Sequence, residues 1–283
     1  MKTGIIDVGG GQRGIFACGV FDRLMDEGIC FDLGIGVSAG SANISSYIAG
    51  QRGRNLQFYL KYVQREEYLS RNNLREKGCM LDVQYIYGTL SNSDGENPLD
   101  YAAFVKNPMD FLVVATEAKT GQAAYLGKQT MRPDYYNALM ASSAIPYVCA
   151  PQKVDDTVYF DGSISDPIPL ERAFSFGCEK VVLLLNCPVN DWDSSKEDKK
   201  LAKHIEAKYP RAAQALCQRT EKYNEGVEYA RRAASEGRVL ILAPQQLHGV
   251  GTLCKDISNL WLLYEDGYQA GAEICSYLDT KPK

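Results

Sequence analysis

Short apolar runs alternate with helically spaced apolar positions along the first fifty residues. Residues 4–8 form a mainly apolar run closed by three glycines, and residues 15–27 carry apolar side chains at helical spacing. Residues 31–37 are a second apolar run, and residues 38–49 combine small side chains with a helical apolar spacing. The pattern predicts strand, helix, strand and helix in this order.

The middle of the chain mixes helical and strand-like patterns. Residues 55–70 and 83–88 contain several Tyr and predict helices that could form a cap. Residues 111–115 and 123–126 are apolar, and Lys119-Thr120-Gly121-Gln122 between them predicts a hairpin or two adjacent strands. A further helix is expected over residues 133–143.

Strands and helices continue to alternate after this point. Residues 154–160 and 180–186 predict strands on either side of a helix led by Pro167 and Pro169, because proline suits the first turn of a helix. Such alternation favours a largely parallel sheet covered on both faces. We therefore predict an α/β fold with a mostly parallel central sheet and helices on both faces.

The composition changes after Pro188. Residues 191–203 are highly charged, and helical patterns continue through Ser235. An apolar strand over residues 239–243 and a final helix over residues 257–278 follow. The predicted organisation is a catalytic core over residues 1–188 and a mainly helical C-terminal region over residues 189–283, with one strand, packed on the core.

Composition narrows the functional classes. The chain has 283 residues, 45% hydrophobic and 23% charged, with a formal net charge of −4, so the basic footprint of a nucleic-acid binder is missing. Contact with lipid would therefore be apolar and transient. The N-terminal run is too short and polar for a secretory signal, and no stretch approaches the roughly 20 apolar residues of a membrane span. The nine cysteines form no CxxC pair, which suits a cytoplasmic protein, and we expect neither a metal nor a cofactor.

The strongest local motif is Gly36-Val37-Ser38-Ala39-Gly40, a G-x-S-x-G between a predicted strand and a predicted helix. In that setting a sharp turn pushes the serine out at the carboxyl end of the strand, and Gly36 and Gly40 leave room for the helix behind it. Ser38 is the candidate nucleophile. The alternative is a serine that only caps the helix.

A glycine-rich loop, Gly9-Gly10-Gly11-Gln12-Arg13-Gly14, also fits G-x-G-x-x-G, the fingerprint of dinucleotide sites. That function needs an acidic residue near the end of the second strand, whereas Asp32 lies at its beginning. Because adjacent parallel strands end at one edge of the sheet, this loop should face Ser38. We assign Gly9, Gly10 and Gly11 to an oxyanion hole, with a simple tight turn as the alternative.

A serine nucleophile needs a base. The chain has two histidines: His204 lies in a charged segment, and His248 lies in a loop where a surface turn is the simpler interpretation. Asp161 ends an apolar run and is followed by Gly162, which would let the carboxylate reach the same edge of the sheet. Asp161 is the predicted base, although an Asp-Gly pair is also typical of a hairpin turn.

Together these residues resemble the patatin-like phospholipase family, and more closely its bacterial members. The resemblance extends over residues 4–169, in the family's motif order. It departs from the family at two positions. Val8 stands where a polar residue is common, and Ser163 stands where a glycine or alanine is common. The matching segments are Gly9-Gly10-Gly11-Gln12-Arg13-Gly14, Gly36-Val37-Ser38-Ala39-Gly40, and Ala141-Ser142-Ser143-Ala144-Ile145-Pro146 leading into Asp161-Gly162.

The resemblance implies an α/β sandwich, a Ser38–Asp161 dyad without histidine, and hydrolysis of acyl esters in lipids. The expected activity is a phospholipase or esterase of lipid metabolism, and Arg13 could hold the glycine loop or meet a substrate phosphate. Two other functions stay open: a non-catalytic lipid-binding relative, and a nucleotide-binding module that uses the Gly9-to-Gly14 loop. The sequence leaves headgroup, acyl chain and oligomeric state undetermined.

Overall fold

Five parallel strands form the centre of the structure, a computed structural model that describes residues 1–190 and 193–279. The strands of the eight-stranded sheet follow the order β5-β6-β3-β2-β1-β7-β8, with β4 paired to β3. β4, β5 and β6 are antiparallel to their neighbours. This confirms the mostly parallel α/β prediction. The strands are β1 (Thr3–Asp7), β2 (Leu33–Val37), β3 (Asp110–Glu117), β4 (Ala123–Gly127), β5 (Gln152–Val154), β6 (Thr157–Asp161), β7 (Lys180–Leu184) and β8 (Val239–Leu242).

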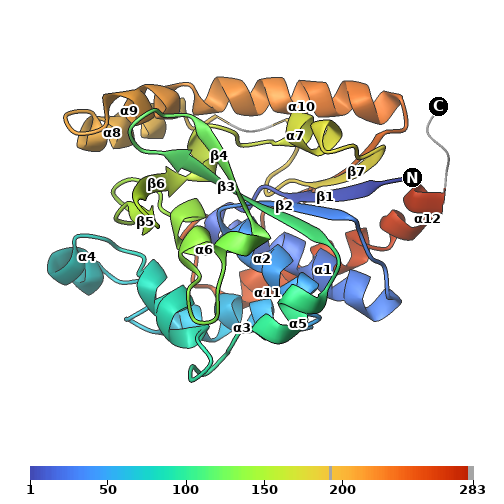
Figure 1. Cartoon of the computed structure of the whole chain (residues 1–283), viewed down its shortest axis with the longest axis horizontal. Coiled ribbons are helices and arrows are strands. Elements are labelled where there is room, and N and C mark those ends of the chain that lie inside the picture. Colours follow the sequence, from blue (N-terminus) through green and yellow to red (C-terminus); the bar gives the residue numbers. More distant parts are fainter. Residues whose placement is uncertain (191–192, 280–283) are drawn as a thin grey trace.

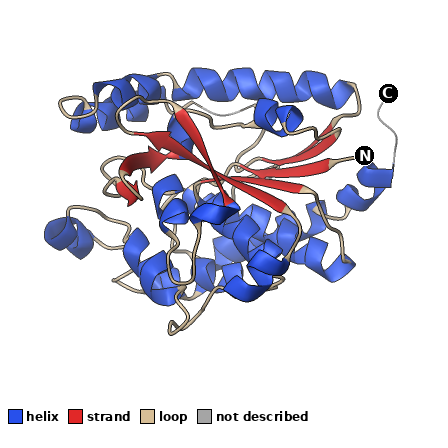
Figure 2. Ribbon diagram, in the orientation of Figure 1, coloured by secondary structure: helices blue, strands red, loops and turns tan. Residues whose placement is uncertain are grey.

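Helices cover both faces of the sheet (Figures 1 and 2). One layer contains α1 (Ile15–Glu27), α2 (Ala39–Ile48), α3 (Arg54–Leu60), α5 (Tyr101–Lys106) and α11 (Ile257–Ala270). The other contains α7 (Leu170–Ser175), α8 (Ser195–Ile205), α9 (Pro210–Cys217) and α10 (Arg219–Ser235). None of the helices in the described part of the chain has the length and hydropathy to cross a bilayer. The remaining helices are α4 (Arg71–Lys77), α6 (Asn137–Ser142) and α12 (Glu273–Asp279).

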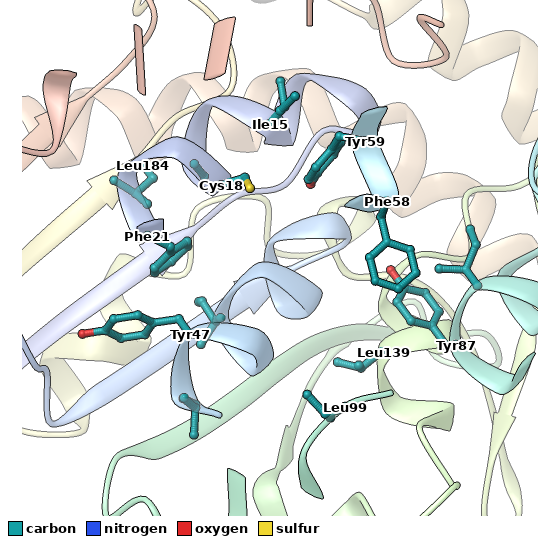
Figure 3. Packing of buried hydrophobic residues seen from close by; sticks show 14 of the residues in the cluster. Ile15, Cys18, Phe21, Tyr47, Phe58, Tyr59, Tyr87, Leu99, Leu139 and Leu184 are labelled. Atoms are coloured by element: carbon teal, nitrogen blue, oxygen red, sulfur yellow. The ribbon is translucent and has the colours of Figure 1, made fainter. Parts of the chain in front are cut away.

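The larger apolar core lies between the sheet and the α1 layer, where Phe21 and Tyr47 pack with ring centres 5.1 Å apart (Figure 3). α1 and α11 approach each other through glycines. A Cβ at Gly19 would lie 2.1 Å from the Tyr264 carbonyl oxygen, and one at Gly267 would lie 1.9 Å from that of Phe16. Larger side chains would force these helices apart, so the C-terminal region packs directly on the first helix.

Several predicted elements have different bounds in the structure. The helix expected over residues 55–70 is α3, which ends at Leu60, followed by a 3-10 turn over Tyr62–Gln64, and the helix expected over residues 83–88 is a π-helix over Tyr85–Leu90. The helix expected over residues 133–143 begins only at Asn137, because Asp134 adopts a positive φ of 59° in the turn before it. The strand expected over residues 154–160 is two strands, separated by a turn at Asp155 with φ 48°. The helix expected over residues 257–278 breaks between α11 and α12 at Gly271, a poor helix former.

Two short helices, α4 and α5, escape the sequence pattern because neither carries an apolar stripe of useful length. Each begins at a capping side chain: Ser70 Oγ accepts a hydrogen bond from the Asn73 amide at 3.1 Å, and Asp100 Oδ1 accepts one from the Ala103 amide at 2.9 Å. The charged segment predicted from residue 191 lies partly outside the described residues, which resume at residue 193.

Candidate active site

Ser38 is the single residue between the end of β2 and the start of α2, with φ 54° and ψ −131°. A positive φ is rare for a residue other than glycine and marks a strained turn. Only glycine fits at positions 36 and 40 beside this turn. A Cβ at Gly36 would lie 2.3 Å from Ser41 Cα, and one at Gly40 would lie 2.2 Å from the Asp7 carbonyl oxygen.

Asp161 reaches Ser38 through an arrangement of strands that the sequence pattern does not predict. β2 and β6 lie along the same edge of β3 and run in opposite directions. Val37, the last residue of β2, pairs with Val114, while Asp161, the last residue of β6, pairs with Ala115. The two strands therefore meet end to end at consecutive positions of β3, which brings Ser38 and Asp161 together. Gly162 allows the exit, since a Cβ there would lie 2.2 Å from the Val114 carbonyl oxygen.

The Asp161 side chain is fully buried, and this burial raises the pKa of its carboxyl group. Hydrogen bonding to Ser163 and Ser38 and the charge of Arg219 lower the pKa in part. Oδ1 accepts the Ser163 amide hydrogen bond at 2.8 Å, whereas Oδ2 has no partner of good hydrogen-bond geometry among the described residues. One carboxylate oxygen is thus fixed by the backbone and the other is available for a proton.

The glycine loop lies directly against the Ser38 turn. A Cβ at Gly9 would lie 2.2 Å from the Val37 carbonyl oxygen, and Gly9, Gly10 and Gly11 have φ values of 70°, 104° and 61°. The Gly9 amide, however, donates to Asp7 Oδ1 at 2.8 Å. Of the three amides predicted for an oxyanion hole, those of Gly10 and Gly11 make no hydrogen bond within the described ranges and are available.

The carboxylate of Asp7 binds the backbone of this loop at Gly9. Its carboxylate is 1% exposed and also accepts a hydrogen bond from Asn43 Nδ2 at 2.9 Å. Burial raises the pKa of Asp7 to about 7, even though the hydrogen bonds from Asn43 and Gly9 lower it. Gly14 ends the loop, where a Cβ would lie 2.7 Å from the Tyr59 hydroxyl oxygen.

The histidines lie elsewhere. His248 Nε2 is 2.7 Å from Asp266 Oδ2 on α11, and the His204 ring stacks on Tyr147 with centres 4.6 Å apart. Neither histidine lines a cavity that contains Ser38. Asp32 accepts the amide hydrogen bond of Thr3 at 2.7 Å, at the edge of the sheet where β1 and β2 begin. It therefore lies far from the place where a ribose would need it.

Two cavities meet at Ser38. The inner cavity runs beneath α2 and α3, and the outer pocket contains Asp161, Gly10, Arg13 and Asn186. Burial lowers the pKa of Arg13, and its Nε has no hydrogen-bond partner in the described part of the chain. Within the same part, no cluster of His, Cys, Asp or Glu could hold a metal ion. The apolar side chains along the inner cavity include Ala42, Phe58, Leu81, Val83, Ile86, Leu99 and Leu139.

Some contacts around the site are not evident from the sequence, although Ser142 and Ala144 belong to one of the segments that resemble the family. Ser142 Oγ accepts the Ser38 amide hydrogen bond at 2.8 Å, and the Asp161 amide donates to the Ala144 carbonyl at 3.0 Å. Thr252, from the C-terminal region, lines both cavities, and its carbonyl accepts the Gln12 amide hydrogen bond at 3.0 Å. These contacts are between residues more than 15 positions apart, so only the fold reveals them.

Comparisons with known proteins agree with the sequence motifs. The family described as Patatin-like phospholipase matches residues 8–174, and a family described as Domain of unknown function (DUF6363) matches residues 209–279. The chain is 26% identical over 200 residues to the uncharacterized protein YjjU of Escherichia coli (strain K12). That match covers 66% of this chain and 52% of the relative, so the chain spans about half the length of that curated protein. The crystal structure of VipD from Legionella pneumophila is similar with a TM-score of 0.48 and 11% identity, over 97% of this chain and 66% of that chain.

Proposed function

This chain belongs to the patatin-like phospholipase family, a family of lipid acyl hydrolases, and we propose that it cleaves carboxylic esters of lipids through an acyl-enzyme on Ser38. The observation that carries the proposal is the meeting of Ser38 and Asp161 at the junction of β2 and β6. Both side chains line the outer pocket, and the Ser38 hydroxyl acts on the pKa of Asp161.

In the first step, Ser38 Oγ attacks the ester carbonyl and Asp161 Oδ2 takes its proton. The new oxyanion is held by the amides of Gly10 and Gly11. When the C–O bond breaks, Asp161 returns the proton to the leaving alcohol, and the acyl group remains on Ser38. A raised pKa suits Asp161 to both transfers, because a base is most effective when its pKa approaches the working pH.

In the second step, water attacks the acyl-enzyme while Asp161 again accepts a proton. The acid product leaves, and the proton passes back to Ser38. α2 begins at Ala39, so the positive end of its dipole lies beside the developing negative charge. No metal or cofactor is part of this proposal.

The two cavities fit the two parts of an ester substrate. The inner cavity, with its apolar walls, would take the acyl chain, and the outer pocket would take the alcohol. Arg13 in the outer pocket could meet a phosphate on that alcohol. The substrate would be a phospholipid, lysophospholipid or related ester, reached by transient apolar contact with a membrane. A cytoplasmic location is also proposed, and its support is the nine cysteines without a CxxC pair.

Labelling with a fluorophosphonate probe tests the nucleophile, and hydrolysis of p-nitrophenyl esters tests the base. The wild type and Ser175→Ala, an exposed serine outside the site, should label and turn over alike. Ser38→Ala should lose both. Asp161→Asn should lower kcat by roughly 10²- to 10⁴-fold, the usual contribution of a general base.

Persistent labelling of Ser38→Ala would show that Ser38 is not the nucleophile. Binding to lipid vesicles without labelling or turnover would indicate a non-catalytic lipid-binding protein. Thermal stabilisation by a dinucleotide, again without turnover, would indicate that the Gly9-to-Gly14 loop binds nucleotides.

A further inference from the structure

Arg54 on α3 is a buried cation that the chemistry at Ser38 does not use. Its side chain lines the inner cavity, the residue is 7% exposed, and its guanidinium carbon lies 5.0 Å from the centre of the Phe58 ring. A buried charge is costly unless a partner of opposite charge compensates it. The contacts of Arg54 therefore indicate what the cavity is built to receive.

The hydrogen bonds of Arg54 all go to neutral oxygens. No carboxylate within the described ranges forms an ion pair with it, and one of its five N–H groups, on Nη1, has no acceptor there. The charge is thus solvated by dipoles but not neutralised. The four acceptors are Pro98 O at 3.2 Å from Nε, Ser46 Oγ at 2.8 Å from Nη1, and Ser91 Oγ at 2.9 Å and Asn97 O at 3.0 Å from Nη2.

Two tyrosines of the cavity wall act on the charge of Arg54. Tyr136 and Tyr87 line the cavity and are the groups that act most strongly on the Arg54 charge. Burial lowers the pKa of Arg54 to about 10, so the guanidinium is charged at neutral pH. Burial also raises the pKa of Tyr87 to about 12, and its hydroxyl lies 3.3 Å from Ser143 Oγ. The guanidinium N–H that has no acceptor makes the Arg54 end of the cavity suited to an anionic oxygen.

This polar end lies well away from the nucleophile. Arg54 Nη1 contacts Ser46, which follows Ser38 by eight positions along α2, or about 12 Å at the rise of an α-helix. Apolar side chains such as Leu99 and Leu139 line the same cavity, and Figure 3 shows them on the same side of the core as Phe58 and Tyr87. The cavity walls therefore combine apolar and neutral polar side chains, and Arg54 supplies a cation at a distance from Ser38.

We propose that the inner cavity takes acyl groups whose far end carries a carboxylate, which pairs with Arg54. The preferred substrates are then esters of ω-carboxy acids of medium chain length, and an ordinary fatty acyl chain leaves the guanidinium without a counter-charge. This specificity rests on the proposed hydrolysis at Ser38, but the binding of the carboxylate can be measured without it.

The decisive comparison uses mono-p-nitrophenyl suberate and p-nitrophenyl octanoate, which differ in the terminal carboxylate. Hydrogen bonds to a charged group contribute enough that kcat/KM for the suberate ester should exceed that for octanoate by roughly 10- to 100-fold. Arg54→Met should lose this preference, so that the ratio of kcat/KM for the suberate ester to that for octanoate no longer exceeds one, and Arg54→Lys should keep part of it. The proposal is overturned if the ratio of kcat/KM for the suberate ester to that for octanoate is one or less in the wild type. It is also overturned if the preference persists in Arg54→Met.

Binding to the Ser38→Ala protein provides a second test that is independent of turnover. Monomethyl suberate should bind at least about tenfold more tightly than methyl octanoate in calorimetry, because only the first of these esters carries a free carboxylate, and equal or weaker binding contradicts the role of Arg54. This comparison also decides the matter if Arg54→Met fails to fold. Turnover of p-nitrophenyl octanoate without any preference for the suberate ester would leave the serine hydrolase intact and remove only the specificity. Binding of monomethyl suberate to Ser38→Ala, with no turnover or labelling of the wild type, would instead support the cavity and contradict the hydrolase.

Discussion

Ser142 Oγ accepts a 2.8 Å hydrogen bond from the amide of Ser38 and donates a 2.6 Å hydrogen bond to the carbonyl of Val114. One buried hydroxyl, 104 positions from Ser38 in the sequence, thereby connects the strained turn to β3. Because the contact is to the backbone of Ser38, it fixes the turn and leaves the Ser38 hydroxyl available for chemistry.

Ser142→Ala should therefore weaken both the fold and the activity. It leaves the Ser38 amide and the Val114 carbonyl without this buried partner, at a cost of about 1–3 kcal/mol for each unsatisfied group. We expect a lower denaturation midpoint and a lower kcat. Ser175→Ala removes an exposed serine that bonds only within its own helix turn and should change neither. Unchanged stability and kcat in Ser142→Ala would show that the turn holds its shape without this tie.

Gly9→Ala should disable the site. The residue needs a φ of 70°, and its new Cβ would lie 2.2 Å from the Val37 carbonyl oxygen. The left-handed backbone costs about 1–2 kcal/mol, and the overpacking adds about 1–3 kcal/mol. Displacement of the neighbouring amides should lower kcat by about 10²-fold.

Gly78→Ala is the matched control for this change. Its φ is 72°, but a Cβ there meets nothing within 4 Å. It should lose only the backbone contribution in urea denaturation and keep full ester hydrolysis. Equal losses in both variants would assign the effect to backbone strain and not to the contact with the Ser38 turn.

Asp7 should make the protein less stable as the pH rises. Its pKa is about 7 in the folded state and near 3.8 when unfolded, so the folded state binds more protons between these values. The stabilisation is complete below the unfolded pKa and is lost as the pH passes through about 7. Between about pH 5 and about pH 8, Asp7 alone should lower the free energy of unfolding by roughly 2.5 kcal/mol.

Denaturation of Asp7→Asn at the same two pH values checks this assignment. The variant cannot ionise at this position, so its stability should fall less than that of the wild type. An equally steep fall would assign the effect to other carboxyl groups whose pKa burial also raises, such as those of Asp22 and Asp166.

His248→Ala should keep ester hydrolysis within about threefold of the wild type. The imidazole pairs with a half-exposed carboxylate of Asp266, and such pairs contribute about 0–1 kcal/mol to stability. Steady-state kinetics with a p-nitrophenyl ester measures the effect. Loss of about a hundredfold or more in the turnover rate would transfer the role of base to this histidine.

The sequence pattern predicts the central elements well, because strand and helix periods are local properties. α1 has the predicted bounds, and the parallel pairing of β1 with β2 places the glycine loop beside Ser38 as expected. The antiparallel direction of β6 is not predictable in this way. A five-residue strand has the same alternation in either direction, and only its pairing with β3 decides which end approaches Ser38.

The remaining parts of the site depend on contacts between distant segments. Asp7 interrupts an apolar run in the sequence, and its hydrogen bond from Asn43 Nδ2 joins residues 36 positions apart. Arg54 directly precedes the helix predicted over residues 55–70, and its burial follows from the loop that supplies Asn97 and Pro98. A side chain's partners are set by tertiary packing, which composition and periodicity do not encode.

The carbonyl of Thr252, which receives the Gln12 amide hydrogen bond, has a consequence for how the protein is made. During translation the glycine loop and Ser38 emerge first, but the wall beside them is contributed by a segment more than two hundred positions later. A polypeptide that ends between these two segments has an unfinished cleft, so the site is complete only after Thr252 has been synthesised.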